Sequence, residues 1–107
     1  MKEKNDYGMY SGAFIFDILD RAALKYVREK SGVADNAVLV TATAYTICFR
    51  RQVCSKKGIT TMCCDYTPTR DGFFCTAQLI QNDTVCADGR FLFKFAHNHC
   101  EIAGATL

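Results

Sequence analysis

The sequence predicts an α+β domain in which one long helix precedes an antiparallel β-sheet. Residues 11–30 repeat apolar side chains at the helical period. The residues after Gly32 are instead rich in Val, Thr, Ile, Tyr and Phe, which favour strands. The chain has one proline in 107 residues, which agrees with long unbroken strands. Because a sheet with an apolar face must bury it, we expect a curved sheet wrapped around the helix.

The helix has start and stop signals at the expected places. Ser11 is a suitable N-cap, and Gly32 stands just past the predicted end. Its apolar side chains cover a wide arc of the helical wheel, which suggests a helix surrounded by protein on most sides. These residues are Ile15, Phe16, Ile18, Leu19, Ala22, Ala23, Tyr26 and Val27.

Four strands and three turns follow the helix. Asp71-Gly72 and Asn82-Asp83 are the clearest turn signals, and Phe91, Phe93 and Phe95 alternate with other residues as in a strand with one buried face. The predicted strands cover residues 38–53, 59–67, 73–81 and 84–95. We therefore expect a single domain over residues 5–95 and a C-terminal tail over residues 96–107.

Composition excludes several classes of function. Half of the residues are hydrophobic and the formal net charge is only +2, which is too little for a nucleic-acid-binding surface. No apolar run approaches the roughly 18–20 residues that cross a bilayer. The first residues contain no apolar signal core. We expect a cytoplasmic protein without nucleic-acid or membrane partners.

Seven cysteines are the unusual feature of the composition. An odd number cannot all pair within one chain, and no C-x-x-C occurs, so we expect reduced thiols that act as small core residues. The alternative is a metal site at His97, His99 and Cys100. Zinc would need a fourth ligand and usually wider spacings, so we expect no metal and no cofactor.

Asp20 is the most informative single residue. On the helical wheel it lies beside Phe16, Leu24 and Val27 rather than on the charged side of the helix. A carboxylate beside an apolar surface loses hydration, and an acid in such a place often marks function. The alternatives are a solvated acid at the helix edge and an acid with a structural partner.

The segment before the helix can form a tight loop. Gly8, Gly12 and Ala13 are small, and free backbone N–H groups at a helix start can polarise a carbonyl oxygen. Asn5 could orient a water molecule or bind a substrate carbonyl, or it could simply form the loop. Together with an acid two turns later, this segment is a candidate hydrolytic site.

These residues carry a family resemblance. The run Asn5-x-x-Gly8-x-x-Ser11-Gly12-Ala13, followed by Asp20, resembles the signature of hotdog-fold acyl-CoA thioesterases. It is most similar to the phenylacetyl-CoA type, whose pattern is Asn-x-x-Gly-x-x-His-Gly-Gly with an in-register Asp in the helix. Residues 46–53 and 88–91 also resemble strands of that family, so the similarity covers about residues 5–95.

The resemblance implies a hotdog fold, a long helix wrapped by a curved antiparallel sheet. It also implies a homodimer or tetramer with acyl-thioester sites at a subunit interface and no metal. By position, Asp20 would be the general base or nucleophile and Asn5 would place water or substrate. The Gly12 N–H would polarise the carbonyl, and Ser11 stands at the family's histidine. Gly8 and Ala13 would shape the substrate site.

Two departures from the family pattern bear on activity. Ser11 replaces histidine and Ala13 replaces the second glycine, so Ser11 is left to cap the helix or donate a hydrogen bond. Only four residues precede Asn5, where the family has a strand. We expect the sheet to lack this first strand, or the strand to lie upstream of the sequence.

A second resemblance keeps a binding function open. Residues 49–53 and 89–91 also resemble the effector domain of bacterial fatty-acid-synthesis repressors, which binds malonyl thioesters without hydrolysing them. Arg50 and Arg51, with Lys56 and Lys57, form a basic group that could steer coenzyme A or acyl carrier protein, or be an ordinary solvated turn. The sequence therefore predicts acyl-thioester hydrolysis, with non-catalytic thioester binding and a purely structural module as alternatives.

Overall fold

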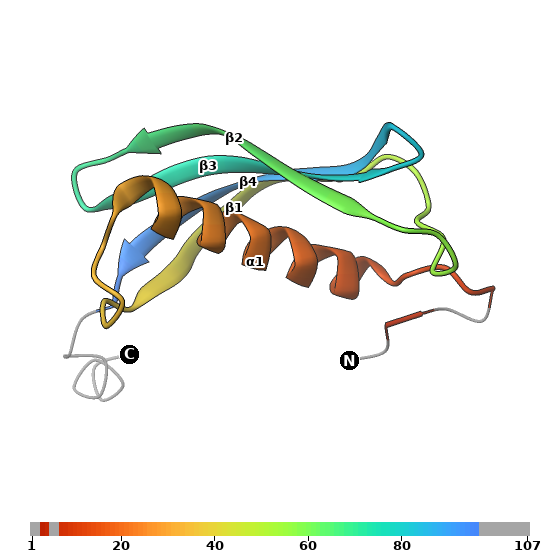
Figure 1. Cartoon of the computed structure of the whole chain (residues 1–107), viewed down its shortest axis with the longest axis horizontal. Helices are drawn as coiled ribbons and strands as arrows, with labels where there is room; N and C mark the ends of the chain where they lie inside the picture. Colours follow the sequence, from red (N-terminus) through yellow and green to blue (C-terminus); the bar gives the residue numbers. More distant parts are fainter. Residues whose placement is uncertain (1–2, 5–6, 97–107) are drawn as a thin grey trace.

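The fold is one helix laid across one face of a four-stranded antiparallel sheet. The computed structural model describes residues 3–4 and 7–96. Helix α1 (Gly12–Ser31) precedes all four strands, and the sheet curves over it (Figure 1). The strands lie in the order β1-β4-β3-β2, with every neighbouring pair antiparallel. The predicted α+β class and the helix-then-sheet order are confirmed.

Helix α1 begins and ends at the predicted signals. The Ser11 side chain accepts a hydrogen bond from the Phe14 N–H at 3.2 Å, as an N-cap does. Gly32 adopts the left-handed conformation with a φ of 67°, and its N–H donates to the Arg28 carbonyl. Both ends are therefore determined by local sequence.

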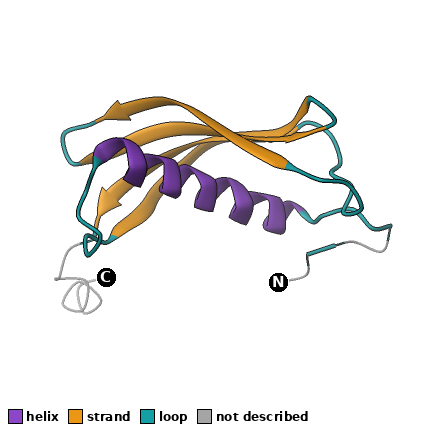
Figure 2. Cartoon of the chain, viewed as in Figure 1, coloured by secondary structure: helices purple, strands orange, loops and turns teal. Residues whose placement is uncertain are grey.

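The four strands correspond to the four predicted ones (Figure 2). They are β1 (Leu39–Phe49), β2 (Thr60–Pro68), β3 (Gly72–Gln81) and β4 (Thr84–Phe95). The prediction that the first strand reaches Val53 is wrong. It ends at Phe49 because the Arg50 and Arg51 N–H groups both turn to the Cys86 carbonyl, at 2.7 and 3.0 Å.

The core lies between one stripe of α1 and the inner face of the sheet. The stripe contributes one fully buried side chain per turn, and the sheet contributes mainly Phe91, Phe93, Leu79 and Cys75. Each fully buried Leu or Phe stabilises the fold by about 1.5–3 kcal/mol. The stripe consists of Ile15, Leu19, Ala23 and Val27.

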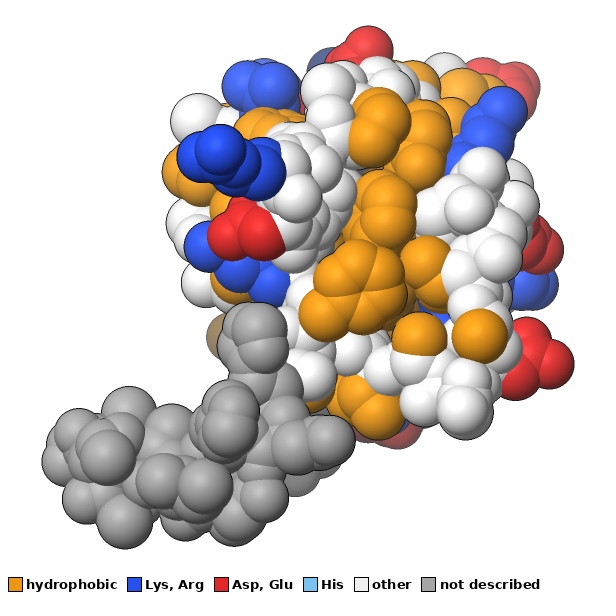
Figure 3. Space-filling model, turned by 90° about the vertical axis from the view of Figure 1, so that its left-hand side faces the viewer, with side chains coloured by type: hydrophobic (Ala, Val, Ile, Leu, Met, Phe, Trp, Pro, Cys, Tyr) orange, Lys and Arg blue, Asp and Glu red, His pale blue; other side chains and the backbone are white. Residues whose placement is uncertain are grey.

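Two expectations about burial are wrong. Phe16 and Ile18 are only half-buried, because the sheet covers one side of α1 rather than most of it. Phe95, the last residue of β4, is 40% exposed, and its ring packs edge-on against Phe73. At the end of the molecule where α1, β2 and β4 finish, apolar side chains form a band on the surface (Figure 3).

The cysteines behave as small strand residues. Cys75 and Cys86 are buried members of the core, and Cys63 packs against it. Cys48 and Cys64 also lie in strands, as predicted, and both are partly exposed. In the described part of the chain, no helix is long and apolar enough to cross a membrane.

Candidate functional site

A pocket of ≈ 260 Å³ lies where α1 begins and β1 ends. One wall comes from the loop that enters the helix, and the other comes from the end of β1 and the segment after it. This pocket brings together three residues that the sequence singled out, Gly12, Arg50 and Arg51. Its lining is Tyr10, Gly12, Ile15, Phe49, Arg50, Arg51 and Gln52.

The two walls are joined by backbone hydrogen bonds. The Tyr10 N–H donates to the Val53 carbonyl at 2.9 Å, and the Ser55 N–H donates to the Gly8 carbonyl at 3.0 Å. The Ser55 hydroxyl also donates to Gly8, at 2.7 Å. Gly8 has a φ of 77°, which a residue with a side chain rarely adopts. The observed role of Gly8 is therefore to turn the loop.

Gly12 offers a free backbone donor to this pocket. The Gly12 N–H has no hydrogen-bond acceptor among the described residues, as is usual in the first turn of a helix. A Cβ placed on Gly12 would contact the Phe49 ring at 3.6 Å, so that ring lies beside the amide. Ala13 follows and is exposed. The predicted oxyanion-binding position is accessible, and Ser11 holds it by capping the helix.

Asp20 lies on the flank of α1 that faces β1. Its side chain is half-buried, and the Thr41 hydroxyl donates to its Oδ1 at 2.5 Å. The acid therefore has a structural partner, one of the alternatives left open by the sequence. Thr41 was missed, although the alternation along β1 places it on the same face as buried Leu39 and so toward the helix.

Asp20 does not line the pocket that contains Gly12. Eight residues separate them on one helix, and at a rise of 1.5 Å per residue they stand about 12 Å apart along the axis. One protomer therefore cannot place both groups on the same carbonyl.

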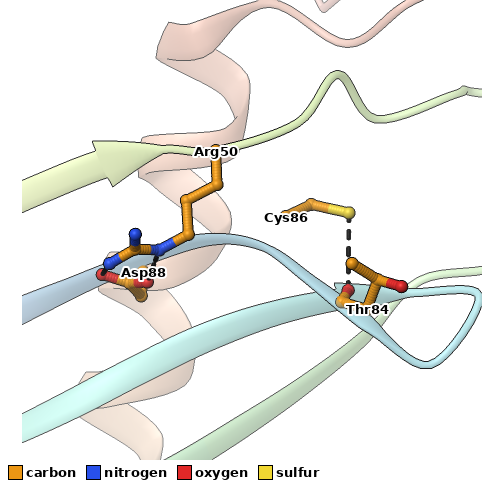
Figure 4. A network of polar contacts seen from close by, with 4 residues as sticks. All are labelled: Arg50, Thr84, Cys86 and Asp88. Carbon is orange, nitrogen blue, oxygen red and sulfur yellow. Dashed lines mark hydrogen bonds and ion pairs between the residues drawn. The ribbon is translucent and has the colours of Figure 1, made fainter.

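The two arginines of the basic group have different environments. Arg50 pairs with Asp88, its Nε donating to Asp88 Oδ2 at 2.5 Å (Figure 4). This hydrogen bond and the nearby negative charge raise the pKa of Arg50. Arg51 is exposed, and its guanidinium has no acidic partner within the described residues. Arg51 is thus the arginine available to a ligand.

The thiols near the helix are protected rather than activated. The Cys63 and Cys75 thiols donate to the Ala22 and Ala23 carbonyls, at 3.6 and 3.7 Å. Burial raises the pKa of both, that of Cys75 to about 12. The Cys86 thiol donates to the Thr84 carbonyl (Figure 4). Because the thiolate is the nucleophile, these environments do not favour cysteine catalysis.

Some predicted residues cannot be placed. Asn5 lies outside the described residues, as do His97, His99 and Cys100. Within residues 3–4 and 7–96, no group of three His, Cys, Asp or Glu side chains could hold a metal ion.

Scans of the sequence against protein-family models and curated proteins find no match. Several solved structures share the fold. The gentisyl-coenzyme A thioesterase BH1999 superposes with a TM-score of 0.70 at 16% identity, over 89% of this chain and 80% of that one. The BH2602 protein from Bacillus halodurans, solved with CoA, gives 0.74 at 15% identity, over 90% of this chain and 62% of that one. HI0827, a hexameric broad specificity acyl-coenzyme A thioesterase, gives a TM-score of 0.74 at 12% identity, over 91% of this chain and 73% of that one.

At these identities the comparison speaks for the fold. The long helix packed on a curved four-stranded antiparallel sheet is the arrangement found in the thioesterases BH1999 and HI0827. The hotdog fold expected from the N-terminal motif is therefore confirmed.

Proposed function

We propose that this chain hydrolyses an acyl thioester of coenzyme A or of acyl carrier protein. The reaction takes place at a site shared by two protomers. Asp20 of one protomer acts as the base, and the Gly12 N–H of the other polarises the thioester carbonyl. The fold shared with acyl-CoA thioesterases and with a CoA-containing structure supports this class of substrate.

The observation that carries the proposal is the separation of Gly12 from Asp20. Both have the chemistry of a hydrolytic site, yet they stand about 12 Å apart along one helix. Two copies of α1 that run antiparallel side by side would bring Asp20 of each opposite Gly12 of the other. A two-fold dimer has this symmetry, because the same surface of each protomer meets the other.

The edge strand β1 is the surface that such a dimer would use. It flanks Asp20 through Thr41, and it is exposed along most of its length. Val40 and Phe49 on this strand are 45% and 53% exposed, although both are large apolar residues. Pairing two β1 strands would satisfy the open edge and join the two sheets into one.

In this mechanism Asp20 accepts a proton from water while the water oxygen attacks the carbonyl carbon. Negative charge develops on the carbonyl oxygen, where the Gly12 N–H stabilises it. The tetrahedral intermediate then collapses and the carbon–sulfur bond breaks. Asp20 returns its proton to the leaving thiolate, so the products are a carboxylic acid and a free thiol. Asn5 would place the water or the carbonyl. Exposed Arg51 would attract the phosphates of the carrier.

A screen of acyl-CoA substrates with a thiol-reporting dye tests the proposal, after subtraction of the signal from the protein's own cysteines. General-base catalysis contributes about 10²–10⁴-fold, so Asp20→Asn should lower turnover by that factor. The matched control is Asp17→Asn, because Asp17 lies one turn before Asp20 on α1 and pairs with Arg21 rather than with Thr41. Equal rates in the Asp20 and Asp17 variants would contradict the role of Asp20.

Binding without hydrolysis is the second candidate, and Ser11 is the observation that favours it. Its side chain caps the helix by accepting from Phe14, at the position where the thioesterase signature that the N-terminal motif resembles has histidine. A binding protein would be stabilised by acyl-CoA in thermal unfolding and would release no thiol from any substrate. Reducing surroundings, as in the cytoplasm, suit either function because six described cysteines carry free thiols.

A further inference from the structure

Gln81 is the one buried polar side chain in the part of the chain that the structure describes. It is the last residue of β3 and only 6% exposed. Burying an amide costs free energy unless its donors and its acceptor form hydrogen bonds. The hydrogen-bond partners of Gln81 therefore indicate its role.

The Gln81 amide binds one backbone unit of the β1–β2 connection. Its Oε1 accepts from the Cys54 N–H at 2.9 Å, and its Nε2 donates to the Cys54 carbonyl at 2.8 Å. Nε2 also lies 3.3 Å from the Lys57 carbonyl. One side chain thus satisfies the donor and the acceptor of Cys54, as a neighbouring strand would do.

Cys54 in turn holds the loop that enters α1. It forms an isolated antiparallel bridge with Met9. The hydrogen bonds on either side of Cys54 are those from Tyr10 to Val53 and from Ser55 to Gly8. The next residues of this loop are Ser11 and Gly12. The loop that carries the free amide is therefore attached to the sheet through Gln81.

Gln81 also supports the second wall of the pocket through its hydrogen bonds to Cys54. Arg51 and Gln52 line that wall, and the segment they belong to is fixed at two places. At the start of this segment, the Cys86 carbonyl accepts hydrogen bonds from the Arg50 and Arg51 amides. At its end, Gln81 accepts a hydrogen bond from the Cys54 N–H. Both walls of the pocket depend on this one side chain.

We propose that Gln81 is a positioning residue that sets the separation between the Gly12 amide and Arg51. It does so without touching the substrate. The inference rests on the proposed function, because it assigns these two groups to the carbonyl and the carrier of one thioester. Misplacing a group by about 1 Å can cost as much as 10²-fold in rate. Loss of the Gln81 contact should therefore lower kcat/KM, and weaker substrate binding should appear as a higher KM.

The test compares Gln81→Met with Gln78→Met. Both remove an amide from β3 at similar volume, but Gln78 is half-buried and makes no side-chain hydrogen bond within the described residues. Gln81→Met should raise KM for acyl-CoA, or the Kd for CoA, about tenfold or more, whereas Gln78→Met should leave them unchanged. A purely structural role would lower the amount of folded protein and leave KM unaltered. An unchanged KM in Gln81→Met would therefore overturn the proposal.

Hydrogen exchange separates this inference from the proposed function. In Gln81→Met, amides of residues 7–11 and 53–57 should lose protection while those of β1 and β4 keep it. This readout holds even if the wild-type protein hydrolyses no thioester. Gln81→Asn keeps an amide donor and acceptor on a side chain one methylene shorter, and it serves as the second variant if Gln81→Met does not fold. It should show a smaller loss of protection in the same two segments. Unchanged protection of residues 7–11 in either folded variant would overturn the inference.

Discussion

Thr41 Oγ1 donates a hydrogen bond to Asp20 Oδ1 at 2.5 Å and so links the edge strand β1 to helix α1. The bond orients a half-buried carboxylate on the flank of the helix that faces β1. Asp20 Oδ2 has no donor among the described residues and can accept a proton from water. Thr41 thus fixes one oxygen of the proposed base and leaves the other for catalysis.

Replacing Thr41 by valine should lower kcat with little effect on KM. Valine has the same shape without the hydroxyl, so Asp20 would lose its orienting donor while the strand keeps its packing. A hydrogen bond to a charged group contributes about 1.5–3 kcal/mol, which corresponds to at least a tenfold fall in kcat. Steady-state kinetics of Thr41→Val on the best acyl-CoA measures it.

Thr43→Val is the matched control for that variant. Thr43 lies two residues along the same strand, but a register shift between Thr41 and Thr43 pairs it with Leu92. This shift places Thr43 on the other face of the sheet, away from Asp20. Its kcat should match the wild type. If Thr43→Val and Thr41→Val lose activity equally, the effect comes from β1 as a whole and not from the bond to Asp20.

The helix could be predicted closely because its signals are local. Ser11 and Gly32 act within a few residues of themselves, and each is found in its predicted role. The end of β1 could not be predicted in this way. The sequence from Val38 to Val53 continues to favour strand, and only the contact of Arg50 and Arg51 with the distant Cys86 carbonyl ends it.

The candidate site was predictable where it depends on spacing along one helix. The wheel separates Asp20 from the solvated side, and the loop of small residues identifies Gly12. The partners across the fold were not predictable, because they depend on register between distant segments. Nothing near Arg50 in the sequence indicates that Asp88 engages it and leaves Arg51 free, or that Gln81 binds Cys54.

Replacing Arg51 by alanine should weaken binding of coenzyme A thioesters mainly at low salt. Arg51 lines the pocket beside Gly12 and is exposed, so its attraction to phosphate is screened by ions. We expect KM to rise about threefold to tenfold at low ionic strength and the difference to shrink at 0.5 M salt. KM measured across a salt series checks this.

Arg70→Ala is the control for the loss of one positive charge. Arg70 is exposed in the β2–β3 turn and lies outside the pocket that contains Gly12. Its KM should follow the wild type at every salt concentration. A salt-independent rise in KM for Arg51→Ala would show that Arg51 shapes the pocket instead of attracting the carrier.

The buried thiols predict a loss of stability at alkaline pH. Burial raises the pKa of Cys75 to about 12 in the folded protein, whereas an unfolded thiol titrates near 8.5. Between these values the folded state binds more protons than the unfolded state, so the free energy of unfolding falls as pH rises. Urea unfolding at pH 7.5 and pH 10 should show the decrease.

Cys75→Ala should reduce that pH dependence, although the raised pKa of Cys63 leaves part of it. The control is Leu79→Ala, which removes buried volume from the same strand, β3, without removing a thiol. Both variants lose core packing and should be less stable at pH 7.5. Only Cys75→Ala should reduce the difference in the free energy of unfolding between pH 7.5 and pH 10. If that difference is as large in Cys75→Ala as in the wild type, Cys75 is not its source.

The edge strand β1 predicts how the protomers assemble. Val40 is 45% exposed near the start of β1, the strand that would pair in the proposed dimer, and a charged residue on an edge strand opposes pairing. Val40→Glu should therefore shift the protein toward monomer in sedimentation velocity and lose thioesterase activity at the same protein concentrations.

Met62→Glu is the control, since it introduces the same charge on the other edge strand, β2, where Met62 is 55% exposed. Because Gly12 and Asp20 of one protomer stand too far apart to act together, an active Val40→Glu monomer would contradict the shared site, whereas an active Met62→Glu dimer supports it.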